Sequence, residues 1–128
     1  MKAIAIVLLV LILGCTSPKK QQGFNFYEQD FKTVFQVSLS ALKDSKFTIK
    51  SYDWNSGEIE GYKALDVHGK RKTISSTVSV EQINSKVKVR LSLAGEVNSE
   101  PIPQSEFKSI ESQFFQSLDN AIKASVLR

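Results

Sequence analysis

The stretch FTIKSYDWNSGEIEGYKAL, residues 47–65, decides the fold, because two alternating segments flank a turn signal within it. Pairs of apolar residues two positions apart occur on both sides of residues 55–57 (Asn-Ser-Gly), as they do in half-buried β-strands. A three-residue hairpin loop needs a left-handed conformation at its third position, and Gly57 can adopt it at low cost. The sequence therefore predicts a β-hairpin with strands over residues 47–54 and 58–65.

The register of this hairpin follows from its apolar residues. With a three-residue loop, Trp54 pairs with Glu58 and Ile49 pairs with Lys63. Four apolar side chains then point to one face, which we expect to be buried: Phe47, Ile49, Ile59 and Leu65. The opposite, solvent-facing side of the hairpin is expected to carry Lys50, Tyr52, Trp54, Glu58, Glu60 and Tyr62.

The segments on either side of the hairpin show two further patterns. Strict alternation over about residues 73–81 and 86–93 predicts a second strand pair, after a polar loop over residues 68–72. Apolar residues at steps of three and four predict amphipathic helices over about residues 27–45 and from Gln104 onward.

These elements share one way of burying their apolar surfaces. Each predicted helix has one apolar stripe, and the predicted sheet has one apolar face, so the three surfaces are expected to pack together. The sequence therefore predicts an α+β two-layer sandwich in the order α-β-β-β-β-α, with residues 26–128 as a single domain. We expect a four-stranded antiparallel meander with both helices on one face, and an outer face left to water or to a partner.

The N-terminus has the features of a bacterial lipoprotein signal. Lys2 precedes the apolar segment 3–13, whose eleven residues would rise about 16 Å as a helix, against about 30 Å for a bilayer core. Such a segment is typical of a signal peptide. The residues Ile12-Leu13-Gly14-Cys15 that follow resemble the lipobox of bacterial lipoproteins, which implies cleavage before Cys15 and lipidation of its sulfur.

This resemblance implies a location and a domain organisation. Residues 1–14 are expected to form the signal peptide, and residues 15–25 the lipidated (palmitate-type) cysteine and a flexible tether. The chain is then anchored to a bacterial cell membrane, facing the periplasm from the outer membrane in a Gram-negative organism. An ordinary secreted protein, or a short signal anchor, is the alternative interpretation of the same segment.

Composition limits the classes of function. Cys15 is the chain's one cysteine, so we expect no disulfide within the domain and packing alone to hold it. The formal net charge of +4 favours anionic surfaces without requiring them. Export makes nucleic acid an unsuitable partner. The expected partners are the membrane, through the lipid, and an envelope protein or cell-wall component.

Residues for catalysis are not evident in the pattern. The chain has one histidine, His68, which predicts neither a metal site nor a catalytic triad. Asp53, Glu58 and Glu60 lie near one another in sequence, but the hairpin register places Asp53 on the opposite side from the two glutamates. We therefore expect a protein that is not an enzyme, with no cofactor other than the covalent lipid on Cys15.

Two surfaces are candidates for binding. The first is the aromatic hairpin face formed by Tyr52, Trp54, Glu58, Glu60 and Tyr62, since exposed aromatic side chains are enriched at interfaces. Simple cross-strand packing is the alternative interpretation of these residues.

The second candidate surface is basic. It is expected to contain Lys70, Arg71, Lys72, Lys86, Lys88 and Arg90. These cations either contact anionic lipid or cell-wall polymer, or simply prevent edge-to-edge association of sheets.

The residues from Leu39 to Ile59, with their F-x-I strand and D-x-x-x-G-x-I hairpin, resemble small envelope lipoproteins, including BamC-like assembly lipoproteins. The resemblance implies a non-catalytic envelope accessory or protein-binding module and assigns no site residue. The alternatives are an envelope enzyme or enzyme inhibitor whose site forms only in three dimensions, and a structural protein without a discrete ligand.

Overall fold

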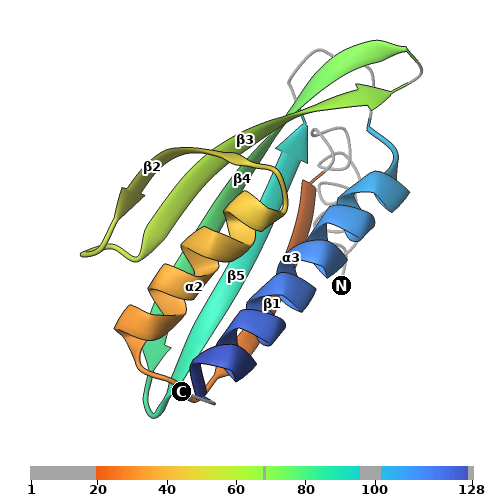
Figure 1. Cartoon of the computed structure of the whole chain (residues 1–128). Helices are drawn as coiled ribbons and strands as arrows, with labels where there is room; N and C mark the ends of the chain where they lie inside the picture. The colour runs from red at the N-terminus through yellow and green to blue at the C-terminus, as the bar shows by residue number, and fades with distance from the viewer. Residues whose placement is uncertain (1–19, 68, 96–101, 127–128) are drawn as a thin grey trace, which may run out of the picture.

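The computed structural model describes residues 20–67, 69–95 and 102–126 (Figure 1). These residues form five strands and two helices. In chain order they are β1 (Lys20–Tyr27), α2 (Phe31–Asp44), β2 (Thr48–Asp53), β3 (Glu58–Val67), β4 (Lys70–Ile83), β5 (Lys86–Gly95) and α3 (Gln104–Val126).

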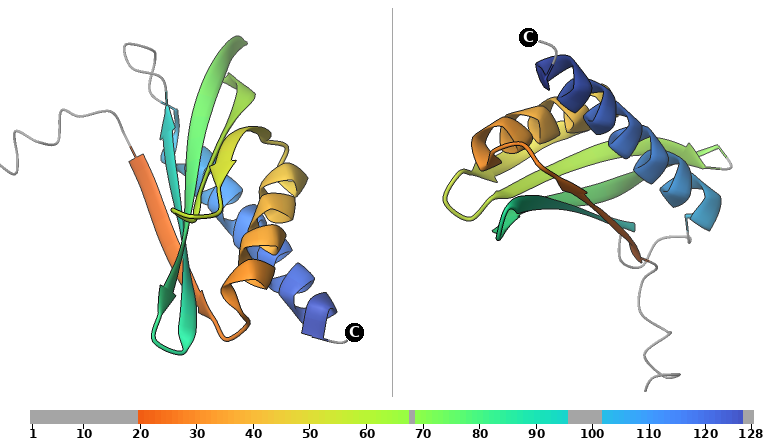
Figure 2. Two further views of the ribbon diagram at one scale, coloured as in Figure 1. Left: turned by 90° about the vertical axis from the view of Figure 1, so that its left-hand side faces the viewer. Right: turned by 90° about the horizontal axis from the view of Figure 1, so that it is seen from below.

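The five strands form one antiparallel sheet in the order β1-β5-β4-β3-β2. The strands from β2 to β5 follow one another as a meander, and β1 joins its far edge beside β5. Both helices lie on the same side of the sheet, which leaves the other side without a covering layer (Figure 2). The α+β class with two helices is confirmed.

The prediction of four strands was wrong, because β1 was not anticipated. Residues 20–25, expected to belong to the tether, pair with β5 in a regular ladder that runs from Lys20 opposite Ala94 to Tyr27 opposite Val87. Gly23 and Asn25 occupy two of the inward positions of β1, and Tyr27 is its one buried aromatic side chain. Its place in the sheet therefore depends on pairing with β5, which is remote in sequence.

Helix α2 begins four residues later than the apolar spacing indicated. Asp30 is its N-cap, and its carboxylate accepts hydrogen bonds from the Thr33 N–H (3.3 Å) and the Thr33 hydroxyl (2.6 Å). The Thr33 hydroxyl is the main cause of the lowered pKa of Asp30. This cap satisfies donors that the first turn of a helix leaves free, so the helix starts at Phe31.

The predicted basic loop over residues 68–72 is also corrected. Lys70, Arg71 and Lys72 belong to β4, because β3 extends to Val67 and the ladder between the two strands continues to their ends. Gly69, with φ of +77°, lies in the tight turn between them.

The core lies between the sheet and the helices. From α2 it takes Val34, Phe35, Ala41 and Leu42, and from α3 it takes Phe107, Ile110, Phe114, Leu118 and Ile122. The inward residues of β3, β4 and β5 complete it, as the alternation predicted. Among the described residues, no helix combines the length and the apolar character that crossing a bilayer needs.

A hydrogen bond links β1 to the helical layer. The hydroxyl of Tyr27 donates to the carboxylate of Asp119 on α3 at 2.7 Å. Burial of the ring, together with this carboxylate, raises the pKa of Tyr27 above its ordinary value. The first strand is therefore fixed to the fold by both its ladder and a side-chain contact with the last helix.

Candidate functional site

The hairpin between β2 and β3 differs from its predicted register. Asp53 pairs with Glu58, so the loop has four residues and not three, and the Gly57 N–H donates to the Asp53 carbonyl at 2.8 Å. Gly57 has φ of +77°, which confirms the expected left-handed glycine. A Cβ at this position would meet the Val80 carbonyl oxygen at 2.1 Å, so the turn also excludes other residues by contact.

A β-bulge at Lys50 changes the faces of the residues that follow it. Ile49 pairs with Gly61 and Ser51 with Glu60, so Lys50 has no partner of its own. Tyr52 consequently pairs with Ile59, which is fully buried on the helix side. A bulge of one residue is enough to reverse the alternation of side chains between the two sheet faces.

The predicted aromatic surface is therefore divided between two faces. The ring of Trp54 lies 4.3 Å from that of Phe35 on α2, and the ring of Tyr52 lies 6.4 Å from it. Glu58, Glu60 and Tyr62 remain on the outer face, opposite Ser79, Thr77 and Ser75 of β4. The expectation that all of them share the solvent-facing side was wrong.

Tyr52 lies at a groove between α2 and β2. The groove has a volume of about 440 Å³ and is lined by Leu39, Lys43, Ile49, Lys50, Ser51 and Tyr52. Although they contact α2, Tyr52 is 55% exposed and Trp54 is 40% exposed. The lining of this groove, which we call the α2–β2 groove, thus combines the Tyr52 ring with Lys43 and Lys50, and the Trp54 ring lies against Phe35 at the same edge of the sheet.

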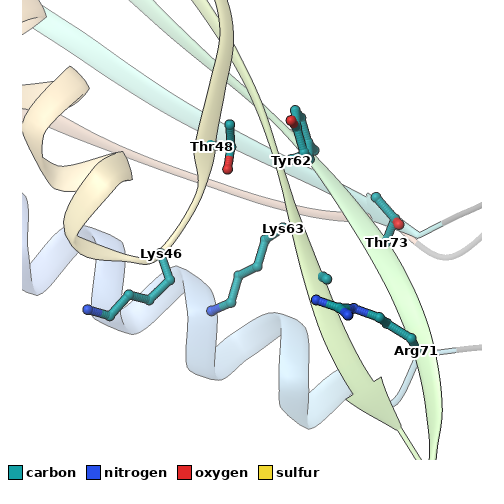
Figure 3. Close-up of a pocket in the computed structure, with 7 residues that line it drawn as sticks. Lys46, Thr48, Tyr62, Lys63, Arg71 and Thr73 are labelled. Carbon is teal, nitrogen blue, oxygen red and sulfur yellow. The ribbon is translucent and has the colours of Figure 1, made fainter.

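A second, basic pocket of about 410 Å³ lies where β3 extends beyond the end of β2. Its cations are Lys46, Lys63 and Arg71, and the side chains of Thr48, Tyr62 and Thr73 complete its polar lining (Figure 3). Asp66 lies directly opposite Arg71 in the ladder between β3 and β4, and Glu106 on α3 is the carboxylate whose charge acts on Lys63.

Lys63 is the most constrained cation of this pocket. Its ammonium group donates to the Ser45 carbonyl at 3.1 Å and lies 5.7 Å from the centre of the Phe47 ring. Burial lowers the pKa of Lys63, as does the nearby Lys46, while the charge of Glu106 opposes the effect. The ammonium group is thus partly desolvated and held in place, which favours an anion over water as its neighbour.

The predicted basic patch is not one surface. Lys88 lies opposite Glu81 of β4, and Glu81 is ten positions from Arg71 on the same strand. Ten residues of extended strand span about 33 Å, so Arg71 and Lys88 are far apart. Lys72 lies on the helix side opposite Leu65 and is only 8% exposed. Lys86, Lys88 and Arg90 lie on the outer face at the other end, so the six cations divide into two separate groups.

The outer face has an acidic half near β2 and β3. Asp53 lies directly opposite Glu58, which corrects the expectation that the two point to different sides. Glu60 follows on the same face and accepts a hydrogen bond from the Ser51 hydroxyl at 3.5 Å. These carboxylates are the outer-face acidic cluster, defined by Asp53, Glu58 and Glu60.

The other half of the outer face, at β1 and β5, is aromatic and basic. Phe24 and Phe26 are 59% and 44% exposed, and the Lys88 ammonium lies 4.5 Å and 5.9 Å from their ring centres. Arg90 lies opposite Phe24 in the ladder. With Lys86, these residues form what we call the β1–β5 patch, which the sequence analysis missed because it placed Phe24 in a tether.

The described residues show no group of three or more histidine, cysteine or carboxylate side chains that could hold a metal ion. Cys15 and His68, named above for lipidation and as the one histidine, lie outside the described residues.

No family model matches the chain, and no curated protein matches it. Among solved structures, TTHA0849 from Thermus thermophilus has a TM-score of 0.49 at 10% identity, covering 84% of this chain and 99% of that one. Ara h 8.0201 has a TM-score of 0.49 at 11% identity, with 87% and 99% covered. The vertebrate conserved region of human METTL16 has a TM-score of 0.46 at 11% identity, with 78% and 98% covered. Similarity at this level assigns the chain to no family.

Proposed function

We propose that this chain is a lipid-anchored bacterial envelope lipoprotein whose domain binds another envelope protein, without catalysis, through the α2–β2 groove. The observation that carries the binding role is the exposure of Tyr52 and Trp54 at one open edge of the sheet while both rings contact Phe35.

The anchor is supported by the lipobox-like residues 12–15 and by the place where the fold begins. Strand β1 starts at Lys20, five residues after Cys15, so the two Cα atoms are at most about 18 Å apart. A lipid on Cys15 would hold the domain directly against the bilayer. More than one acyl chain is needed for stable attachment, since each buried methylene contributes only about 0.8 kcal/mol.

The groove has the physical features of a protein-binding surface. Aromatic rings that are half-exposed but already packed lose little conformational freedom when a partner covers them. Lys43 and Lys50 line the groove together with Tyr52, which favours a partner segment that combines apolar and acidic side chains. The strand β2 is also an edge strand, and its bulge limits simple extension of the sheet.

The binding role is tested by photo-crosslinking in cells, with the probe amino acid placed at position 52 or at position 62. Tyr62 is a matched control, because it has similar exposure (46%) but lies on the outer face. It also lines the basic pocket, which suits an anionic ligand, so a protein adduct is not expected from it. We expect position 52 to give a discrete protein adduct, identified by mass spectrometry, that position 62 does not give. Equal adducts from both positions, or none from position 52, would contradict the groove as the binding surface.

The anchor is tested by Cys15→Ser. We expect this variant to move from the membrane fraction to the soluble fraction and to lose metabolic labelling by palmitate. Recovery of the parent chain with a free thiol, or with residues 1–14 still attached, would contradict the lipoprotein assignment.

The basic pocket supports a second candidate function, the binding of an anionic cell-wall polymer. The supporting observation is the grouping of three cations, Lys46, Lys63 and Arg71, around one pocket. Arg71→Gln should then weaken sedimentation with purified cell wall, whereas Arg90→Gln, at the other end of the sheet, should not. Equal loss in both variants would indicate a general effect of charge.

A further inference from the structure

Strand β1 carries two of its three aromatic side chains, Phe24 and Phe26, on the outer face of the sheet, whereas Tyr27 points to the core. Its inward positions include Gly23 and Asn25, opposite the buried Leu91 and Val89, and its outward positions include the two phenylalanines of the β1–β5 patch. Their rings contact each other edge to face, with centres 5.8 Å apart, and no helix covers this side (Figure 2). Neighbouring exposed aromatic residues of this kind indicate a surface that is covered in the working molecule.

The charges around these rings are positive. Lys88 lies over both rings, Arg90 is opposite Phe24, and Lys86 follows on the same face. One carboxylate, that of Glu81, lies opposite Lys88 in the ladder. The outer-face acidic cluster lies at the other edge of the sheet, so the outer face is positive at β1 and negative at β2.

The patch also lies on the strand by which the chain enters the fold after Cys15. Phe24 follows Cys15 by nine residues, and β1 is the first strand of the domain. A lipid on Cys15 would keep its Cα at the membrane surface, within about 18 Å of Lys20. Aromatic rings flanked by lysine and arginine are suited to this environment, where the ring enters the interface and the cation meets phosphate.

We propose that the β1–β5 patch lies against the surface of the anchoring bilayer, with Phe24 and Phe26 in the interfacial region and Lys86, Lys88 and Arg90 against anionic headgroups. This proposal rests on the lipid anchor proposed above. In this orientation the acidic cluster is turned away from the anionic surface. The helices and the α2–β2 groove, on the other side of the sheet, face the aqueous compartment and are presented to a partner.

The test uses the lipidated full chain, purified from membranes and reconstituted into vesicles of phosphatidylcholine and phosphatidylglycerol that contain brominated acyl chains. Trp54→Phe removes the native tryptophan and keeps a ring against Phe35. In that background, Phe26→Trp places a reporter in the patch, and Tyr52→Trp places one with similar exposure on the helix side.

We expect bromine to reduce the emission of the tryptophan at position 26 by about half or more, with a shift to shorter wavelength, and to leave the tryptophan at position 52 unchanged. Adding Lys88→Gln and Arg90→Gln should reduce this quenching about twofold, because the headgroup contacts are lost. Replacing phosphatidylglycerol with phosphatidylcholine should have the same effect.

Flotation of the same samples separates the two proposals. If the chain floats with the vesicles and position 26 is not quenched, or is quenched no more than position 52, the membrane orientation is wrong and the anchor stands. If the purified chain carries no lipid and does not float, the anchor is wrong, and the orientation built on it is overturned as well.

Discussion

At the β2 edge of the sheet, the rings of Tyr52 and Trp54 turn toward α2, whereas at the β1 edge the rings of Phe24 and Phe26 turn away from both helices. Both edges carry two aromatic residues that are two positions apart and roughly half-exposed. At the β2 edge a bulge reverses the alternation, while at the β1 edge the ladder is regular. The comparison teaches that register, and not composition, decides which layer an aromatic pair joins.

The difference has consequences for what each edge can do. The rings of Tyr52 and Trp54 both contact the fully buried Phe35, so this pair is continuous with the core. The β1 pair contacts only its own strand and the cation of Lys88 among the ring contacts described, so its rings are available to an external apolar phase. The first arrangement suits a protein partner and the second suits a membrane interface.

The largest expected effect comes from removing the ring that supports the β2 edge. Phe35→Ala should lower the free energy of unfolding by about 3–5 kcal/mol, because Phe35 is fully buried and its loss leaves a cavity beneath Trp54. Phe24→Ala, at the other edge, is the control and should change it by about 0.5 kcal/mol or less. Chemical denaturation followed by Trp54 fluorescence measures both. Similar losses of stability in the two variants would mean that the aromatic residues of both edges contribute equally to the core.

The next effect concerns how β1 is attached. Tyr27→Phe should lower the free energy of unfolding by about 1.5–3 kcal/mol, because it leaves the half-buried carboxylate of Asp119 without its hydroxyl donor. The raised pKa of Tyr27 also predicts a pH dependence. In the unfolded chain Tyr27 releases its proton near pH 10, whereas the folded chain retains it.

The contribution of Tyr27 to stability is therefore fully present below about pH 10 and is lost as the pH rises further. Denaturation midpoints between pH 8 and 11 should fall with pH in the parent chain and less steeply in Tyr27→Phe. Tyr62→Phe, which alters an exposed ring, is the control. An unchanged slope in Tyr27→Phe would show that other groups cause the dependence.

A smaller effect tests the bulge directly. Deleting Lys50 leaves Ile49 and Tyr52 on the helix side with Ser51 between them, so the ladder becomes regular. We expect the free energy of unfolding to change by about 1 kcal/mol or less and the emission wavelength of Trp54 to stay unchanged. Deleting Glu60 from the paired strand is the contrasting variant, because it reverses the faces on one side of the deletion and should prevent folding.

The smallest expected effect lies in the shared core between the two edges. The Ser76 hydroxyl is buried and has no hydrogen-bond partner within the described residues. Ser76→Ala should therefore leave the stability unchanged or raise it by up to about 1 kcal/mol. If thermal denaturation showed instead that Ser76→Ala lowers the stability by more than about 1 kcal/mol, the hydroxyl would have a hydrogen-bond partner that the described residues do not reveal.

The local features of the chain could be predicted from its sequence. The spacing of apolar residues indicated α2 and α3, the alternation indicated the four strands of the meander, and Gly57 was correctly assigned to a left-handed turn. Periodicity and turn chemistry depend on residues close together in the chain, so they are visible without a structure.

The composition of the surfaces could not be predicted in the same way. The strand β1 exists because β5, more than sixty residues away, supplies its hydrogen-bond partners. The bulge at Lys50 leaves one residue unpaired and places Ile49 and Tyr52, three positions apart, on the same face; the same spacing occurs in a regular strand when the two residues lie on opposite faces. The six cations of the predicted patch were separated by the length of β4.

By itself, then, the sequence determined the class of fold, the number of helices and the lipobox-like segment that predicts an anchor at Cys15. The tertiary structure decided which side chains share a face: Tyr52 with α2, Asp53 with Glu58, and Phe24 with Lys88. The physical reason is that alternation has a period of two residues, so a single unpaired residue or a remote strand partner exchanges the faces without changing the pattern.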